Sequence, residues 1–213
     1  MSDQPTSLFD SGSGSGFGSV GSAPGSGLGG ATTQPLDRPK RRELTWSSGT
    51  DFGLVLLRFA VGGVVFAHGM QHVFGLWGGI GLPGLSSALT AFGFRNVNLL
   101  VWVTALTELV GGAAVVLGIF TPLAAAGLLA LMINAVLLKA VNGFFIAGPP
   151  GAASVELEVV LGLGAAALLL TGAGRIALER GRTWNRRPAP WGVLFLIIGV
   201  AAALLVFFLL RPR

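Results

Sequence analysis

The residues best suited to chemistry lie in one apolar stretch near the start of the chain, Leu56 to Gly75 (LLRFAVGGVVFAHGMQHVFG). Arg58, His68 and His72 stand there among side chains that would enter a bilayer. An arginine at the centre of a membrane helix costs about 2.5–3.5 kcal/mol, so such groups normally face a protein interior or a wet cavity. At about 100° per residue the three side chains fall within an arc of about 80°. Any chemistry is expected to start from that face.

His68 and His72 are the only histidines, and their spacing of four puts both rings on one side of a helix near its end. Glu156 and Glu158 begin a later apolar segment that we predict to start at the same membrane surface. Residues two apart diverge by about 200°, so only one of these carboxylates can face the histidines directly. Histidine with carboxylate can anchor a helix end, bind a quinone headgroup, move protons or, as His68, His72 and Glu156, ligate zinc or iron.

A further carboxylate, Glu108, lies in the next apolar segment. Counted at 1.5 Å per residue, Arg58 is about 10 Å from the inner end of its span, and Glu108 about 14 Å from the same membrane face. The similar depths predict an Arg58–Glu108 ion pair, which would lower the cost of both charges in lipid. Such a pair either only pins two helices together or takes part in handling a proton or substrate.

The composition predicts a membrane protein, in which helices that cross the bilayer position these residues. Of 213 residues, 52% are hydrophobic and only 11% are charged, whereas soluble domains are about a quarter charged. The absence of cysteine excludes disulfides, thiolate metal sites and a dithiol relay on this chain. The net charge of +5 does not point to nucleic acid, because the basic residues cluster beside apolar segments and fit an attraction to anionic lipid.

Five segments are close to the twenty or so residues that cross about 30 Å of hydrocarbon. They are 51–74, 97–119, 122–142, 154–173 and 191–210. The fold class predicted is all-α: a four-helix transmembrane bundle plus one additional C-terminal transmembrane helix. The last segment has no polar side chain, and we expect it to be peripheral and to face lipid. Glycines within the spans permit the close approach by which membrane helices pack.

Basic residues predict the orientation. Residues 1–45 form a Gly/Ser-rich tail that ends in a basic anchor, and this composition is typical of disorder. Nine of the fourteen basic residues fall in segments that are cytoplasmic if the N-terminus is inside: Arg38, Lys40, Arg41, Arg42, Arg175, Arg180, Arg182, Arg186 and Arg187. Five spans then place the C-terminus outside, as the positive-inside pattern requires.

Several motifs together resemble the DoxX family. Besides Arg58 they are AHGMQHVFG (67–75), TELVGGAAVVLGIFTPLA (107–124), NGFF (142–145), VELEVVLGLG (155–164) and GAGRIALE (172–179). The resemblance covers about 51–180. It implies a four-span protein of the bacterial plasma membrane, related to the small DoxD-like subunit of thiosulfate:quinone oxidoreductase. The family motif also favours Glu156 over Glu158 as the carboxylate facing the histidines. The tail and the fifth span, 191–210, lie outside the resemblance.

Two functions follow as expectations. In the first, the chain is an accessory subunit of a redox or respiratory membrane complex that binds quinone, with Arg58, His68, His72, Glu108 and Glu156 lining the site. In the second, it is a structural assembly subunit that docks other membrane proteins through the tail and 191–210. A quinone-linked oxidoreductase subunit is ranked slightly below an accessory one, because the chain has no cysteine and no haem or flavin motif. Transport is a third, weaker possibility, because the chain shows little sign of inverted repeats.

The orientation can be tested in a chain that contains no native cysteine. Single cysteines at Ser13 and Arg182 are expected to resist a membrane-impermeant thiol reagent in intact cells, whereas one at Pro149 reacts. Permeabilised cells, in which all three should label, are the control. Labelling at Arg182 together with protection at Pro149 would invert the topology.

Overall fold

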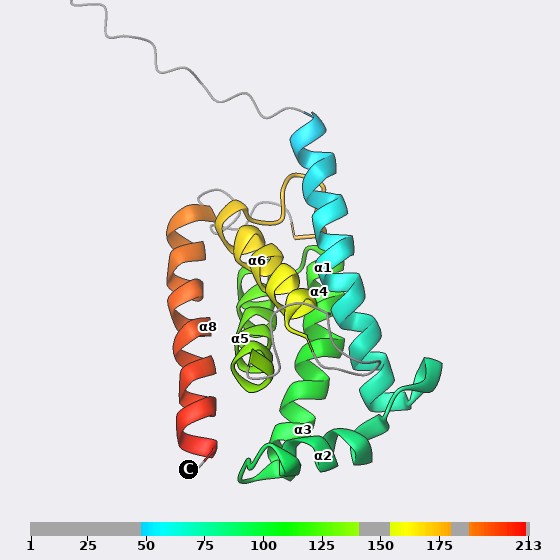
Figure 1. The fold of residues 1–213 in the computed structure, drawn as a ribbon. Coiled ribbons are helices and arrows are strands. Elements are labelled where there is room, and N and C mark those ends of the chain that lie inside the picture. Colours follow the sequence, from blue (N-terminus) through cyan, green and yellow to red (C-terminus); the bar gives the residue numbers. More distant parts are fainter. Residues whose placement is uncertain (1–47, 141–153, 180–187, 212–213) are drawn as a thin grey trace, which may run out of the picture. The chain divides into compact units, whose positions relative to one another are not determined.

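The computed structural model describes residues 48–140, 154–179 and 188–211, and the regular structure in these ranges is helical. The long helices are α1 (Ser48–Phe74), α5 (Thr121–Lys139), α6 (Glu156–Thr171) and α8 (Pro188–Leu210). Between α1 and α5 lie η1 (Leu76–Gly78), α2 (Gly81–Ala91), α3 (Val97–Leu106), the π-helical turn η2 (Thr107–Gly111) and α4 (Gly112–Leu117). Figure 1 shows α3 and α4 following one another as a single rod beside α1.

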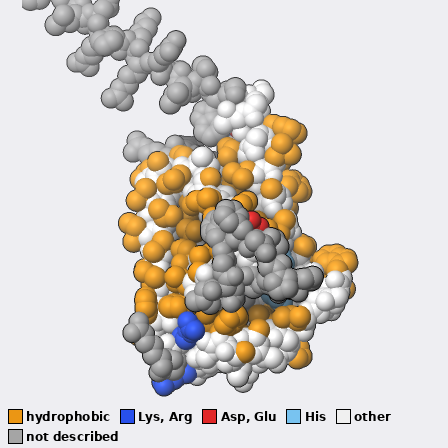
Figure 2. Space-filling model, in the orientation of Figure 1, with side chains coloured by type: hydrophobic (Ala, Val, Ile, Leu, Met, Phe, Trp, Pro, Cys, Tyr) orange, Lys and Arg blue, Asp and Glu red, His pale blue; other side chains and the backbone are white. Residues whose placement is uncertain are grey.

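The protein is a multi-pass membrane protein. Within the described residues, four helices are long and apolar enough to cross a membrane: α1, the continuous rod Val97–Leu117, α5 and α8. The face seen in Figure 2 is mostly hydrophobic on its described part, as expected for a surface in contact with lipid. The segment predicted as the fourth span, 154–173, forms the 16-residue helix α6. At 1.5 Å per residue this helix is about 24 Å long, shorter than the roughly 30 Å of hydrocarbon.

Contacts between helix ends show that the segments alternate in direction. At one end, where α2 lies, Lys139 in the last turn of α5 pairs with Glu158 in the first turn of α6, and Arg95 N–H donates to the carbonyl of Leu210. At the other end, Arg175 N–H donates to Asp51 in the first turn of α1. The start of α1 and the end of α8 therefore lie at opposite ends of the bundle, as five alternating segments require. We call them the Asp51 end and the α2 end.

Glycines let α1 and the α3–α4 rod touch through their backbones. A Cβ added to Gly62 would lie 2.7 Å from the carbonyl oxygen of Gly112, and one added to Gly112 would lie 2.6 Å from Phe66 N. Gly63, beside Gly62, faces away and has no such neighbour within 4 Å. The predicted close approach is thus confirmed at Gly62 and Gly112, and the crossing fixes the register of the two helices.

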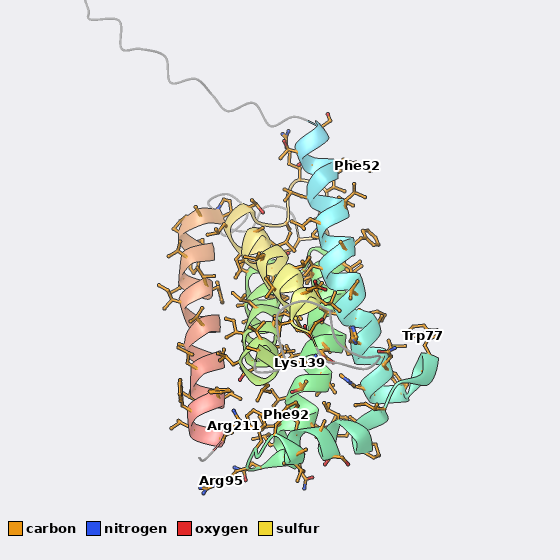
Figure 3. The ribbon with its side chains drawn as sticks, viewed as in Figure 1. Phe52, Trp77, Phe92, Arg95, Lys139 and Arg211 are labelled. Carbon is orange, nitrogen blue, oxygen red and sulfur yellow. The ribbon has the colours of Figure 1, made fainter. Side chains whose placement is uncertain are left out.

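The segment between the first two spans forms a short helix, α2, of 11 residues, which is too short to cross the membrane. Leu85 of α2 is buried with Val101 and Ala105 of α3, so α2 lies against the rod. Before α2 the chain turns sharply, and Trp77 adopts a left-handed backbone (φ 51°) with its side chain 70% exposed. Trp77 projects away from the helices in Figure 3, a position that suits an interfacial aromatic residue.

The C-terminal helix is the least buried of the four candidate spans, as its uniform apolarity predicts, with 11% of its most apolar stretch buried against 33–39% in the others. Gly192, Gly199 and Ala203 share one buried side of α8, where small residues permit close packing on α5 and α6. Arg211 follows α8 and donates from Nε to the carbonyl of Phe92, 2.8 Å away, at the α2 end (Figure 3). Most other residues of α8 are exposed, so its predicted peripheral position is confirmed and only one narrow side packs on the bundle.

Several sequence predictions concern residues outside the described ranges. These are the tail 1–45, the NGFF motif with the turn that follows it, and the basic residues from 180 to 187.

The glycine crossing predicts unequal effects of the same small substitution. Gly112→Ala is expected to destabilise the bundle by about 1–3 kcal/mol, because the added methyl group meets backbone rather than a flexible side chain. Gly63→Ala is the matched control: it adds the same group to open space, and replacing a helical glycine stabilises by up to about 1 kcal/mol. Thermal unfolding in detergent measures both. Equal midpoints for the two variants would contradict the crossing.

Candidate functional site

A histidine and a glutamate meet where α1 and η2 cross. Nδ1 of His72, in the last turn of α1, lies 2.6 Å from Oε2 of Glu108 in η2. The side chains are 16% and 10% exposed, so each polar group gains a partner away from water. A carboxylate on one ring nitrogen fixes the orientation of an imidazole and leaves the other nitrogen available to a ligand. The pair can therefore bind a polar group or exchange a proton with it.

The backbone brings this pair together. A Cβ on Gly69, one turn before His72, would lie 2.5 Å from Leu109 N, so no larger residue fits where α1 meets η2. The π-helical turn widens the rod locally at Glu108, and π turns are frequent at functional sites. Glu108, only 8% exposed as a residue, is in this way held against the last turn of α1.

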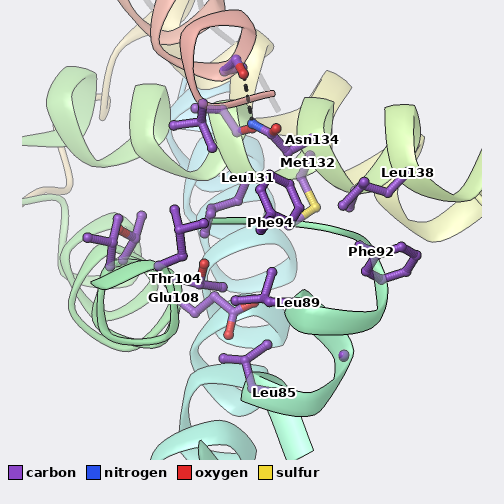
Figure 4. A pocket seen from close by; sticks show the side chains of 18 of the residues that line it. Leu85, Leu89, Phe92, Phe94, Thr104, Glu108, Leu131, Met132, Asn134 and Leu138 are labelled. Carbon is purple, nitrogen blue, oxygen red and sulfur yellow. Dashed lines mark hydrogen bonds between the residues drawn. The ribbon is translucent and has the colours of Figure 1, made fainter. Parts of the chain in front are cut away.

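The pair borders a pocket of about 460 Å³ at the α2 end. Its walls come from α2, α3, α5 and α8, and most of them are aliphatic or aromatic (Figure 4). The apolar lining residues include Leu85, Leu89, Phe92, Phe94, Leu100, Val103, Leu131, Met132, Leu138, Ala202, Ala203 and Val206. An apolar cavity with a few polar groups is the usual form of a small-molecule site.

Few other polar side chains reach the pocket. Asn134 of α5 donates from Nδ2 to the carbonyl of Ala130 (3.0 Å) and to that of Ala203 in α8 (3.2 Å). Lys139 also lines the pocket, and its ammonium group pairs with Glu158 at 2.5 Å. Thr104 and Thr107 complete the polar lining.

Residues 53–141 match the family model of DoxX. The chain contains a DoxX family domain. No curated protein and no solved structure matches the chain. The DoxX domain covers less than half of the chain and includes His72, Glu108, α2 and α5. The pocket extends beyond it, because α8 supplies one wall.

The predicted ion pair between Arg58 and Glu108 is wrong. Arg58 is buried, 2% exposed, but its Nη2 donates to the carbonyl of Ile176, near the Asp51 end. A Cβ on Gly118 would collide with its Nη1, so a glycine is needed beside the guanidinium. Glu108 instead pairs with His72.

The antiparallel register of α1 and the rod explains this correction. Since Gly62 faces Gly112, Arg58 lies level with Gly118, and Glu108 lies level with Gly69. Ten residues of helix separate the two levels, about 15 Å. The estimate from sequence counted the depth of each residue from a different span end. In the structure these two ends are not level: the rod ends at Leu117, beside Arg58, whereas α1 extends another ten residues back to Ser48.

The other predicted site residues are not assembled. His68 and Glu156 make no hydrogen bond or ion pair within the described ranges, and Glu158 pairs with Lys139 rather than with a histidine. Over the same ranges no three His, Asp or Glu side chains come together as a metal site. The structure thus joins His72 to Glu108 and leaves Arg58, His68 and Glu156 apart from them.

Sequence reasoning missed the contribution of α8 to the pocket and the return of the chain after α6. Phe120 N–H donates to Glu179 at 2.6 Å, and Leu178 N–H donates to the carbonyl of Leu117. The GAGRIALE motif therefore closes over the end of the rod and over Arg58. The sequence did contain a signal for the packing of α8 on the bundle: the small residues at positions 192, 199 and 203 share one helix face.

The corrected pairing predicts which substitutions are coupled. Breaking one member of a partly buried charged pair leaves the other uncompensated. His72→Phe and Glu108→Leu are therefore expected to be less destabilising together than the sum of the single changes, with a coupling of about 0.5–3 kcal/mol. Thermal unfolding of the four proteins in detergent measures it.

Arg58→Leu combined with Glu108→Leu is the control cycle. These sites are separated along the bundle, so their effects should add to within about 0.5 kcal/mol. If each of these two substitutions compensated for the other, Arg58 and Glu108 would have to interact, which would contradict the register of α1 and the rod.

Proposed function

We propose that the protein is an accessory membrane subunit of a redox complex and that it binds a quinone-class molecule in the pocket at the α2 end. The observation that carries this proposal is a single imidazole–carboxylate pair set in apolar walls. A quinone has the matching chemistry: a flat ring with polar oxygens, attached to an apolar tail.

The size and position of the pocket support this ligand class. A volume of about 460 Å³ lies within the range of small-molecule sites, about 300–1,000 Å³. Three of its walls, α3, α5 and α8, belong to helices long and apolar enough to cross the membrane, so a lipid-soluble ligand is favoured over a polar one. At the ring oxygen, the nitrogen of His72 not held by Glu108 can donate or accept a hydrogen bond according to its protonation.

An accessory role is favoured over an autonomous enzyme. With no cysteine in the chain, any thiol-dependent step would need a partner subunit. The outward face of α8 exposes Ile197 and Phe208 at 60% and 61%, and this face suits contact with lipid or with a neighbouring membrane subunit. An assembly role without a ligand is the second candidate, supported by the same exposed face.

Deleting 191–210 cannot distinguish these two functions. The deletion would remove both the exposed face and the pocket wall formed by Ala202, Ala203 and Val206. Substitutions on opposite sides of the same helix can distinguish them, since they alter one surface at a time.

Val206→Phe places a ring in the pocket, and Leu205→Phe places the same ring on the exposed side of α8, where Leu205 is 56% exposed. Val206→Phe is expected to lose most of the quinone that co-purifies in a mild detergent, while Leu205→Phe keeps it. His72→Phe removes a hydrogen bond worth about 1 kcal/mol and should lower quinone affinity about fivefold.

Mass spectrometry of extracted quinones and co-purifying proteins measures both functions at once. Unchanged quinone content in Val206→Phe and His72→Phe would overturn ligand binding. Partners lost only in Leu205→Phe would then favour the assembly role.

A further inference from the structure

Asn134 presents an unused hydrogen-bond acceptor beside the pocket. Its Nδ2 donates to two carbonyl oxygens, those of Ala130 and Ala203. These contacts fix the orientation of the amide, because a flipped side chain would set Oδ1 against two acceptors. Oδ1 is left buried, and no group in the described ranges donates a hydrogen bond to it. A buried acceptor in this state gains from any donor that reaches it.

Asn134 and the His72–Glu108 pair line the same pocket from different helices. In Figure 4 the labelled Glu108 and Asn134 lie on opposite sides, with Phe94 and Leu131 between them. The pocket therefore has a polar group at each side and an apolar middle. This arrangement suits a ring that carries oxygens at opposite positions.

We infer that Asn134 is a second ligand-binding residue and that its Oδ1 selects the reduced, hydroquinone form of the ligand over the oxidised quinone. The inference rests on the proposed function, because it concerns the same pocket and the same ligand class. In this inference Asn134 discriminates between the hydroquinone and the quinone, whereas the His72–Glu108 pair alone does not.

The selection follows from hydrogen-bond chemistry. A hydroquinone hydroxyl donates to Oδ1, whereas a quinone carbonyl is itself an acceptor and is repelled by it. The imidazole of His72 does not discriminate, because its free nitrogen donates or accepts according to its protonation.

The test compares three ligands that share one tetramethylated ring, on the full-length protein in lipid nanodiscs under anaerobic conditions. Durohydroquinone carries two hydroxyl donors, duroquinone carries none, and the dimethyl ether of durohydroquinone carries none and is redox-inert. Calorimetric titration is expected to give a dissociation constant for durohydroquinone about fivefold or more below those of the other two, the effect of one added hydrogen bond.

Variants locate the origin of the preference. Asn134→Leu should bring the ratio of hydroquinone to quinone affinity to about one, and His72→Phe should weaken both ligands while the ratio persists. Asn98→Leu is the matched control, since Asn98 is exposed, lies outside the pocket lining and undergoes the same change. Its ratio should equal that of the wild type.

The outcomes separate the inference from the proposed function. If none of the three ligands binds the wild-type protein, the quinone-class site itself is overturned. If durohydroquinone and duroquinone bind equally well to the wild type, or if the preference survives Asn134→Leu, only the selection by Asn134 is overturned. If Asn134→Leu does not fold, His72→Phe keeps the inference testable, because loss of the preference in that variant would assign it to His72 rather than to Asn134.

Discussion

Backbone contact between α1 and the α3–α4 rod is the constraint on which the rest of the structure depends. In a membrane, helices gain no hydrophobic free energy by leaving lipid for one another, so their packing relies on close van der Waals contact. Gly62, Gly69 and Gly112 supply that contact, each where a Cβ would meet the backbone of the other helix. A crossing this close has one register. The register decides which polar side chains meet, and it therefore sets the chemistry at both ends of the bundle.

At the α2 end the register gives His72 the partner Glu108, and at the Asp51 end it leaves Arg58 with one acceptor from the chain after α6, the carbonyl of Ile176, while its Nε and Nη1 have no partner among the described residues. The two ends thus use their buried polar groups differently. Arg58 holds the return of the chain through a main-chain carbonyl, which is a contact that stabilises the fold. The His72–Glu108 pair borders a pocket, and its imidazole keeps one nitrogen for something outside the pair.

Much of the fold could be predicted from the sequence, because the length and apolarity of a span follow directly from the thickness of the bilayer. The site could be predicted only in part. His72 and Glu108 were recognisable as polar groups in apolar segments, but their pairing depends on a register that depth counting resolves to no better than a few turns. The π turn at 107–111 and the bond from Asn134 to Ala203 involve backbone geometry, which no side-chain pattern announces.

The helix α8, which lies outside the DoxX domain, both completes the pocket and orients Asn134. The DoxX domain supplies the His72–Glu108 pair and α5, yet without α8 the pocket would lack the wall formed by Ala202, Ala203 and Val206. Asn134 belongs to the domain and donates to a carbonyl of α8, so the helix beyond the domain orients an amide within it. Ala203 is fully buried, and its small side chain is what lets α8 come close enough to accept that bond. A helix that carries no polar side chain can in this way decide, through its backbone alone, which face of an amide a neighbouring pocket presents.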